Sequence, residues 1–470
     1  MSFSLFETES GIRFYYDNIN NQILEVDGTP VTPGMIVDEA TANYANQTFG
    51  KTTKHNRPVG IRILLGHACN FSCAYCLQKD IGNPSEIPKN IMLNSTIKTI
   101  EKTLVLDDLV RIELWGGEPL LYWKDMVELI KYFDREGLTI GITTNGSALR
   151  PKHAELFATL KSHVAISISH DAAMQGMLRG NDPLDNASVV ETLRMFDRLD
   201  NVHYGFLCSL TNTNFNLFEI NDFFRDRILQ LGLKTNSISY SLGRTYSESN
   251  TFDPSSALGC NVLEDGTQAP AGSATHVIHG ENLEIFRGML FEYLEQHYLQ
   301  MIDSYVDGRP TIFDKTAAET PLLLCDIYES PIGYSVLEYA SKTLNGTPII
   351  ETTNCGADMT DVLSIDINGN VRTCVHTGED HIAGNIKNID HVNIQRMNLN
   401  REAHCGTCVN RKLCRSSCPI DLDDDTHIIN CNVEKVWYGE LQKAALRLIM
   451  NEPVRMISTG LSTINNNKKE

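Results

Sequence analysis

No stretch of this 470-residue sequence approaches the run of about 18 apolar residues that a helix needs to span a bilayer. Its first residues also lack a basic segment followed by an apolar one. The sequence has fewer positive than negative side chains, with 40 Lys and Arg residues against 59 Asp and Glu residues, and its formal net charge is −19. Since phosphate binding requires a basic surface, this balance disfavours nucleic acid and favours a small or peptide substrate. These absences predict a cytoplasmic protein with neither a membrane nor a nucleic acid as partner.

Cysteine, in contrast, is abundant, and its positions matter more than its number. In a reducing compartment thiols serve metals or catalysis rather than disulfides, and thirteen cysteines cannot all pair. Three lie together in GHACNFSCAYC, seven lie late in the chain, and Cys208, Cys260 and Cys325 stand apart. The two groups are therefore expected to be functional, whereas Cys208 and Cys325 lie in apolar segments and are expected to be buried small hydrophobes.

The middle of the chain alternates between two patterns. Short apolar runs end in Gly, Asn, Ser or other polar residues, and between them lie amphipathic segments such as residues 124–137 and 188–199. Six strands alternating with helices predict an α/β fold with a parallel sheet or barrel, whose functional residues gather at the carboxyl ends of the strands. The predicted strands are IRILLGH, RIELWGG, LTIGITTNG, HVAISIS, VHYGFLCSL and SISYSLG.

The pattern predicts five regions. Residues 1–58 form a small β-hairpin appendage, and residues 59–245 form the barrel core. Residues 246–350 begin with a Ser-, Gly- and Pro-rich stretch that suggests a substrate-facing loop, and continue as bridging helices. Residues 351–435 hold the second cysteine group, and residues 436–470 form a helix and a polar tail.

The first cysteine group has the spacing C-x3-C-x2-C, through Cys69, Cys73 and Cys76. On a loop, three such thiolates can turn to one point and hold three corners of an iron–sulfur cubane, which leaves the fourth iron without a protein ligand. The alternatives are a zinc site, for which His67 is the one nearby fourth ligand, and a chance cluster of buried thiols.

Polar segments follow the predicted strands at the same end of the sheet as these cysteines. The first is WGGEP, residues 115–119, whose glycines allow close backbone approach and whose carboxylate can meet an ammonium group. TTNG and SISHD follow the next two strands, at residues 143–146 and 167–171.

The motifs CNFSCAYC, WGGEP, TTNG and SISHD, in this order, resemble the radical S-adenosylmethionine (SAM) superfamily over roughly residues 59–245. The resemblance implies a partial (β/α)6 TIM-like barrel. It also implies a [4Fe–4S] cluster on Cys69, Cys73 and Cys76, whose open iron is chelated by SAM. The implied SAM contacts are Tyr75, Gly116, Gly117, Glu118, Pro119, Asn145, Ser169, Asp171 and Arg179. Among them, WGGEP would meet the amino group, Ser169 and Asp171 the ribose, Tyr75 the adenine and Arg179 the carboxylate. Where related enzymes read S-x-D-G, this chain has Ala172.

The second cysteine group contains C-x2-C-x5-C-x3-C, and chance does not explain seven cysteines at these spacings. Tandem zinc sites, with His404 as a further ligand, are one reading. The segment VLSIDINGNVRTCVH, residues 362–376, predicts a β-hairpin around an Asn-Gly turn, and its Asp and Asn residues also mimic part of a calcium loop. The seven cysteines are Cys355, Cys374, Cys405, Cys408, Cys414, Cys418 and Cys431.

This region resembles the C-terminal SPASM domain of radical SAM enzymes that modify peptides, including the position of Gly369. The resemblance implies two auxiliary [4Fe–4S] clusters, the first on Cys355, Cys374 and Cys418, the second on Cys405, Cys408, Cys414 and Cys431. The first lacks a fourth cysteine, so Asp361 or Cys325 completes it, or one iron stays open. Sulfatase maturases of this family carry an Asp after the cysteine that matches Cys374, where this chain has Val375.

Together the motifs predict a radical SAM/SPASM maturase of ribosomally made peptides. It would abstract hydrogen from a precursor peptide and install a carbon–carbon or thioether cross-link, with an external one-electron donor such as flavodoxin or ferredoxin. The resemblance identifies no catalytic residue beyond the cofactor sites. The alternatives are a dehydrogenase or rearranging enzyme acting on a small molecule or protein side chain, and a zinc-binding scaffold. Strand addition of the peptide leader to residues 1–58 is a further hypothesis.

Overall fold

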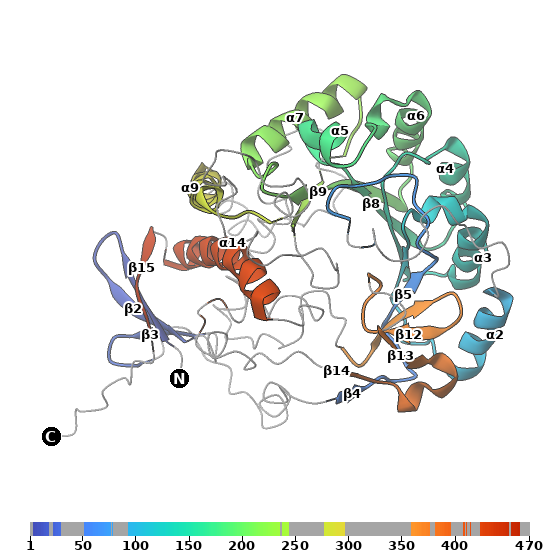
Figure 1. Ribbon diagram of the computed structural model, residues 1–470, viewed down its shortest axis with the longest axis horizontal. Helices are drawn as coiled ribbons and strands as arrows, with labels where there is room; N and C mark the ends of the chain where they lie inside the picture. Colours follow the sequence, from blue (N-terminus) through green and yellow to red (C-terminus); the bar gives the residue numbers. More distant parts are fainter. Residues whose placement is uncertain are drawn as a thin grey trace, which may run out of the picture.

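The computed structural model describes the N-terminal hairpins, the barrel and parts of the C-terminal region (Figure 1). The described residues are 3–17, 22–29, 51–76, 78, 93–235, 237–243, 277–296, 359–376, 381–395, 408, 410, 414, 424–450 and 453–460. The predicted loop within 246–276, the predicted ligands Cys355, Cys405 and Cys418, and the alternative ligands Cys325 and His404 lie outside them.

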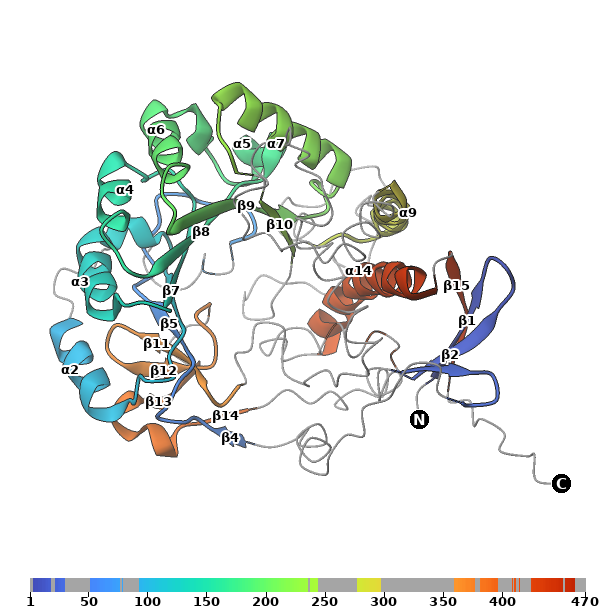
Figure 2. The same ribbon diagram turned by 180° about the vertical axis from the view of Figure 1, so that it is seen from behind.

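The six predicted strands form one parallel sheet, in which sequence neighbours are also spatial neighbours. The strands are β5 (Gly60–Leu64), β6 (Arg111–Trp115), β7 (Thr139–Thr144), β8 (His163–Ser169), β9 (Val202–Leu210) and β10 (Ile238–Leu242). The curved sheet carries its helices on the convex side (Figures 1 and 2). These helices are α2 (Leu93–Thr103), α3 (Trp123–Phe133), α4 (Pro151–Phe157), α6 (Ala187–Phe196) and α7 (Leu217–Leu231). The prediction of a mixed α/β fold with a partial barrel is confirmed.

Strands β5 and β6 show how the sheet packs against these helices. In β5 and β6 the isoleucines and leucines at alternate positions are buried in the common core, which they share with the apolar face of α3. Arg62 and Glu113 occupy the intervening positions and lie on the other, inner face. Local signals fix the helix ends: Asn216 accepts hydrogen bonds from the first turn of α7, and Gly232 ends this helix at φ 62°.

The hairpin predicted at residues 362–376 forms, and it extends the barrel sheet. Strand β11 (Val362–Asp366) pairs in parallel with β5, and β12 (Asn370–Arg372) and β13 (Ile382–Asn385) continue the sheet. Gly369 takes φ 78° in the turn, and the side chain of Asp366 accepts hydrogen bonds from the backbone N–H groups of Asn368 and Asn370. The carboxylate therefore stabilises a turn, as the hairpin interpretation predicted.

The two ends of the chain share a separate antiparallel sheet, in the order β15-β1-β2-β3. The predicted hairpin is confirmed as β2 (Arg13–Asp17) and β3 (Gln22–Glu25), and β1 (Phe3–Thr8) pairs with β15 (Val454–Gly460). The sequence interpretation missed β15, because a seven-residue strand near the end of the chain is recognisable only through its distant partner.

The C-terminal helix is also longer than predicted. Helix α14 (Asp424–Met450) begins well before residue 436 and includes Cys431. Its buried positions include Asn430, Glu434 and Glu440, so polar residues interrupt the apolar pattern from which its start would be recognised. It packs on α9 (Glu281–Gln296), where the rings of Trp437 and Phe286 stack with centroids 6.1 Å apart.

Short elements complete the described structure. Strands β4 (Lys51–Thr53) and β14 (Asn393–Gln395) form a small antiparallel pair. The short helices are η1 (Pro119–Tyr122), η2 (Ala172–Met174), α5 (Gln175–Leu178), η3 (Pro183–Asp185) and η6 (Ile386–His391). Within the described residues, no helix combines the length and the apolar character needed to cross a membrane.

Candidate active site

The predicted motifs meet at the carboxyl edge of the parallel sheet. The loop with Cys69, Cys73 and Cys76 follows β5, and the glycine pair follows β6. The backbone N–H of Gly117 donates to the Gly66 carbonyl at 2.9 Å, and the N–H of Glu118 donates to the Ala68 carbonyl at 2.9 Å. WGGEP therefore holds the backbone that leads directly into Cys69.

Glycine is required at residue 117 by this close approach. A Cβ atom built there would overlap the backbone carbonyl oxygens of His67 and Ala68, and neither backbone group can move aside easily. A side chain at this position would therefore displace the cysteine loop. The structure thus gives a physical reason for the second glycine of the motif.

The side chain of Glu118 is held by hydrogen bonds within the protein. Its carboxylate is fully buried and accepts hydrogen bonds from Leu120 N (3.0 Å), Thr144 Oγ1 (2.7 Å) and Asn145 N (2.7 Å). Burial raises its pKa, an effect that these hydrogen bonds oppose. The carboxylate therefore joins the β6 and β7 motifs, and the expectation that it also meets an ammonium group stays a prediction. A contact of the WGGEP backbone with the SAM amino group stays a prediction.

Asn145 lies beside the first cysteine. Its amide nitrogen donates to Asn70 Oδ1 at 3.0 Å and lies 3.9 Å from Cys69 Sγ. Its backbone is fixed at the same time by Glu118, so two neighbouring strands position one amide against one thiol.

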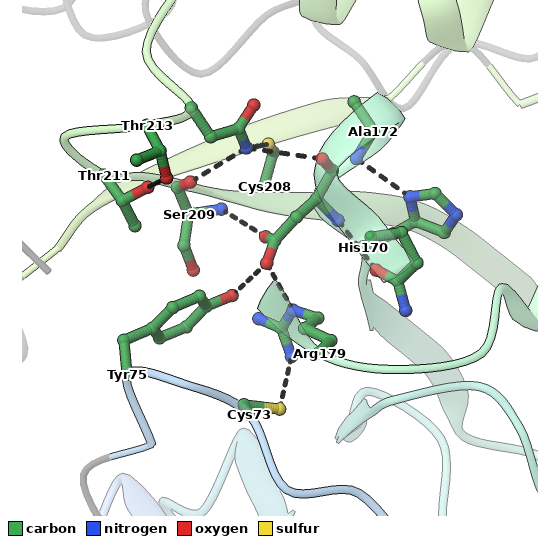
Figure 3. A network of polar contacts seen from close by, with 12 residues as sticks. Cys73, Tyr75, His170, Ala172, Arg179, Cys208, Ser209, Thr211 and Thr213 are labelled. Carbon is green, nitrogen blue, oxygen red and sulfur yellow. Dashed lines mark hydrogen bonds and ion pairs between the residues drawn. The ribbon is translucent and has the colours of Figure 1, made fainter. Parts of the chain in front are cut away.

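A buried network joins the cysteine loop to β8 and the residues after it (Figure 3). The carboxylate of Asp171 accepts hydrogen bonds from Tyr75 Oη, from Arg179 Nε at 3.0 Å and from Ser209 N at 3.1 Å. The Arg179 guanidinium lies 5.2 Å from the centre of the Tyr75 ring, and its Nη1 is 3.9 Å from Cys73 Sγ. Tyr75 and Arg179, two predicted SAM contacts, are thus both held by a third, Asp171.

The electrostatics of this network stabilise its ionised form. Burial lowers the pKa of Arg179, but the adjacent Asp171 raises it overall. Burial raises the pKa of Tyr75, so the phenol stays protonated and donates to Asp171. Burial also raises the pKa of Cys73 to about 11, while Arg179 acts in the opposite direction. Arg179 is therefore the cation that stabilises negative charge on Cys73 most directly.

Ala172, which follows Asp171, carries the one positive φ of a non-glycine residue in the described structure, 51°. This is where related enzymes have glycine, so the chain keeps the left-handed backbone with an alanine. Its neighbours fix the turn, because Ala172 N donates to His170 Nδ1 at 3.0 Å and Asp171 N donates to Gln175 Oε1 at 3.0 Å. His170 is itself held by Asp182 at 3.0 Å.

We expect substitutions of Ala172 to separate strain from bulk. Ala172→Val should destabilise the protein by about 2 kcal/mol or more, because a β-branched side chain is poorly tolerated in the left-handed region and this residue is buried. Ala172→Gly should be neutral or stabilising by up to about 1 kcal/mol, because lost strain outweighs the entropy of glycine. Urea unfolding measures both effects, and a valine variant as stable as wild type would contradict the assigned backbone conformation.

The three early cysteines fit a [4Fe–4S] cluster in the chemistry of their surroundings. Cys69 has an amide N–H donor beside its sulfur, Cys73 has a guanidinium, and Cys76 is exposed at the outer side of the loop. Hydrogen-bond donors to cluster sulfurs tune and stabilise such sites. Among the described residues, no three His, Cys, Asp or Glu side chains stand close enough to hold a single metal ion.

The second cysteine region contacts the first. Gln78, two residues after Cys76, donates from Nε2 to the Val375 carbonyl at 3.1 Å, and the His376 ring packs edge-on against Trp115 with centroids 5.0 Å apart. Cys374 follows strand β12 of the hairpin and directly precedes Val375. Its Sγ accepts a hydrogen bond from His376 N at 3.4 Å. One late cysteine is therefore held beside the early cysteine loop.

Three further late cysteines gather around α14. Cys414 Sγ donates to Glu434 Oε2 at 3.2 Å, and burial raises the pKa of Cys431 to about 11, with Cys408 and Glu434 nearby. Glu434 was not predicted, although its place three residues after Cys431 puts it on the same helix face.

The structure also shows partners that the motifs did not indicate, including Ser209 and Gln175 on the Asp171 network. Ser209 near the end of β9 repeats the pattern of polar residues at strand ends, so that pattern could have found it. The functional roles of the predicted cysteines, glycines and polar residues stay predictions, although the structure brings together those that it describes.

Comparison with known proteins identifies the barrel. Residues 63–208 match the sequence profile of the Radical SAM superfamily. These residues, from β5 to β9, form a radical SAM domain.

Curated relatives match only part of this chain. The Homo sapiens protein Molybdenum cofactor biosynthesis protein 1 is 39% identical over 105 residues, 22% of this chain and 15% of that protein. The GTP 3′,8-cyclase of Clostridium perfringens (strain SM101 / Type A) is 30% identical over 184 residues, 38% of this chain and 52% of that enzyme. The chain therefore spans about half, or less, of these relatives.

A solved structure shows a similar fold beyond the radical SAM domain. Native anSMEcpe with bound AdoMet and the Cp18Cys peptide has a TM-score of 0.53 and 15% sequence identity, over 83% of this chain and 99% of that chain. At this identity the likeness concerns the fold alone.

Proposed function

We propose that this radical SAM enzyme is a SPASM-type peptide maturase, which removes hydrogen from a precursor peptide and closes a carbon–carbon or thioether cross-link. The observation that carries the proposal is the contact of the two cysteine regions at one edge of the barrel, through Gln78 with Val375 and Trp115 with His376. The fold that it shares with anSMEcpe, a protein solved with AdoMet and a peptide, supports it.

When bound, the [4Fe–4S] cluster and SAM supply one-electron cleavage of the sulfonium, giving methionine and the hydrogen-abstracting 5′-deoxyadenosyl radical. The task of this chain is to hold the cluster, to orient SAM and the substrate, and to exclude water. Cys69, Cys73 and Cys76 would hold the cluster, and Asn145 and Arg179 would donate toward its sulfurs. Backbone groups of Gly116 to Pro119 would lie near the SAM amino group.

The ribose and adenine would lie near Ser169 and the Asp171 network. Because Asp171 already accepts hydrogen bonds from Tyr75, Arg179 and Ser209, a direct ribose contact requires one of these partners to shift. Arg179 can pair with the SAM carboxylate through the guanidinium nitrogens that do not face Asp171.

The late cysteines would hold two auxiliary clusters, with Cys355, Cys374 and Cys418 on one and Cys405, Cys408, Cys414 and Cys431 on the other. These clusters would accept the second electron of the oxidation or hold a substrate thiolate, and flavodoxin or ferredoxin would supply the first electron. Asp361 is a weak candidate for the missing ligand, because its backbone carbonyl pairs with Val59 N at the amino end of β5, opposite the Cys69 loop.

The test is anaerobic incubation of the reconstituted enzyme with SAM, dithionite and the peptide encoded by a short reading frame beside its gene. The expected product is a peptide lighter by two hydrogens, together with 5′-deoxyadenosine. The likeness to GTP 3′,8-cyclase makes GTP the matched alternative substrate, and conversion of GTP but not of the peptide would overturn the proposal. Colourless protein that contains zinc and lacks iron would instead support a scaffold.

A further inference from the structure

One side chain on a central strand of the barrel sheet is exposed at the inner face. Ser167 lies within β8, between Thr143 of β7 and Gly205 of β9 in the register of the sheet, and it is exposed. A residue between two paired strands can be exposed only through one face of the sheet. Since the helices cover the convex face (Figure 2), Ser167 opens to the inner face.

This inner face carries a charged group of three residues that the proposed chemistry does not use. Glu113 accepts a hydrogen bond from Arg62 Nε at 2.9 Å on one carboxylate oxygen and from Arg111 Nε at 2.8 Å on the other. Burial raises the pKa of Glu113, but the two guanidinium groups lower it overall, so the carboxylate is ionised. Within this group of three, two guanidinium groups therefore share one carboxylate.

Arg111 carries the more accessible of the two guanidinium groups. Its side chain is 49% exposed, against 20% for Arg62, and within the described part of the chain Glu113 is its one ion-pair partner. A Cβ atom on Gly141 would lie 3.2 Å from Arg111 Nη2, so the guanidinium lies over this glycine on the inner face. Ala165 is the next residue across the sheet, and the small size of Gly141 lets the side chains of Arg111 and Glu113 lie against the strand.

We propose that Arg111 binds a carboxylate of the substrate on the inner face of the barrel. The inference rests on the proposed function in one respect, that the substrate enters the barrel below the cysteine edge. Arg111 and Trp115 are four residues apart on β6, so the carboxylate lies about 13 Å from that edge, within reach of about four extended residues. In a protein with a net charge of −19, this guanidinium selects an anionic group by local pairing.

Binding of three small peptides to the reconstituted full chain, without SAM, tests the site. Ac-Gly-Glu-Gly-NH2 carries a side-chain carboxylate, Ac-Gly-Gly-Gly-OH a terminal one, and Ac-Gly-Gln-Gly-NH2 none. We expect at least one carboxylate peptide to bind about tenfold more tightly than the glutamine peptide in ligand-observed NMR titrations. The preferred peptide shows whether a side chain or a chain end is the natural group.

Variants locate the effect. Arg111→Gln should remove the preference, Arg111→Lys should keep most of it and show that the site still folds, and Arg225→Gln should change nothing. Arg225 is the matched control, because it also pairs with carboxylates but lies on α7. Equal affinity for all three peptides, no measurable binding, or a preference that survives in Arg111→Gln would overturn the inference. None of these results would decide the proposed function, which is tested separately by the mass change of the peptide.

Discussion

Replacing Cys69, Cys73 and Cys76 together by alanine is expected to abolish formation of 5′-deoxyadenosine from SAM and to leave about two-thirds of the bound iron, if each of three clusters holds four irons. The three thiols are the ligands on the loop that WGGEP fixes at the carboxyl edge of the sheet. Without them no iron remains beside the predicted SAM groups, so one-electron cleavage loses its electron source. Anaerobic turnover with dithionite and an iron assay on the same preparation measure both effects.

Cys208 provides the matched control, because it is also a cysteine of the barrel but is buried in β9. Its sulfur contacts Asn214 Nδ2 at 3.4 Å, within the core beside the Asp171 network. Cys208→Ala should therefore keep its iron and its 5′-deoxyadenosine formation, with a modest loss of stability. Deoxyadenosine production that survives in the triple variant would show that the cluster assignment is wrong.

The sequence was most informative where local chemistry determines structure. All six barrel strands could be predicted, because each is a short apolar run, often β-branched, that ends in a polar residue or glycine, and their helices carry a clear apolar periodicity. The hairpin around Gly369 was equally predictable from its Asn-Gly turn. These features depend on residues within a few positions of one another.

The pairing of strands that lie far apart in the sequence could not be predicted in the same way. Nothing within residues 362–366 indicates that this strand would pair in parallel with β5, about 300 residues earlier, or that β15 would pair with β1. The start of α14 was missed for a related reason, since its buried polar residues are stabilised by partners that only the folded chain brings near.

The candidate site shows the same division. The identity of the cysteines and of the polar residues at the strand ends followed from spacing, and the structure places them together. The direction of each side chain did not follow from spacing. The motif did not indicate that Glu118 joins two loops, or that Asp171 accepts hydrogen bonds from Tyr75 and Arg179. A motif identifies which residues matter, whereas their partners depend on packing.

Asp171→Ala is expected to lower the free energy of unfolding by about 3–5 kcal/mol, the largest loss of stability expected from any single substitution at this site. The carboxylate is fully buried, and its removal deprives the Arg179 guanidinium and the Ser209 N–H of an acceptor and takes one hydrogen bond from the Tyr75 hydroxyl. An uncompensated guanidinium that is 10% exposed accounts for most of this cost. Urea unfolding of the apoprotein measures it without any contribution from bound iron.

The control for this prediction is a carboxylate and arginine pair at the surface. Asp222→Ala removes the partner of Arg225 on α7, where the Asp222 side chain is 59% exposed, and should cost less than about 1 kcal/mol. The double variant Asp171→Ala/Arg179→Ala should be more stable than the two single losses predict, because it removes the buried charge together with its acceptor. Additive losses would show that Asp171 and Arg179 do not act as a pair. The link between the cysteine loop and Asp171 would then be the hydrogen bond from Tyr75.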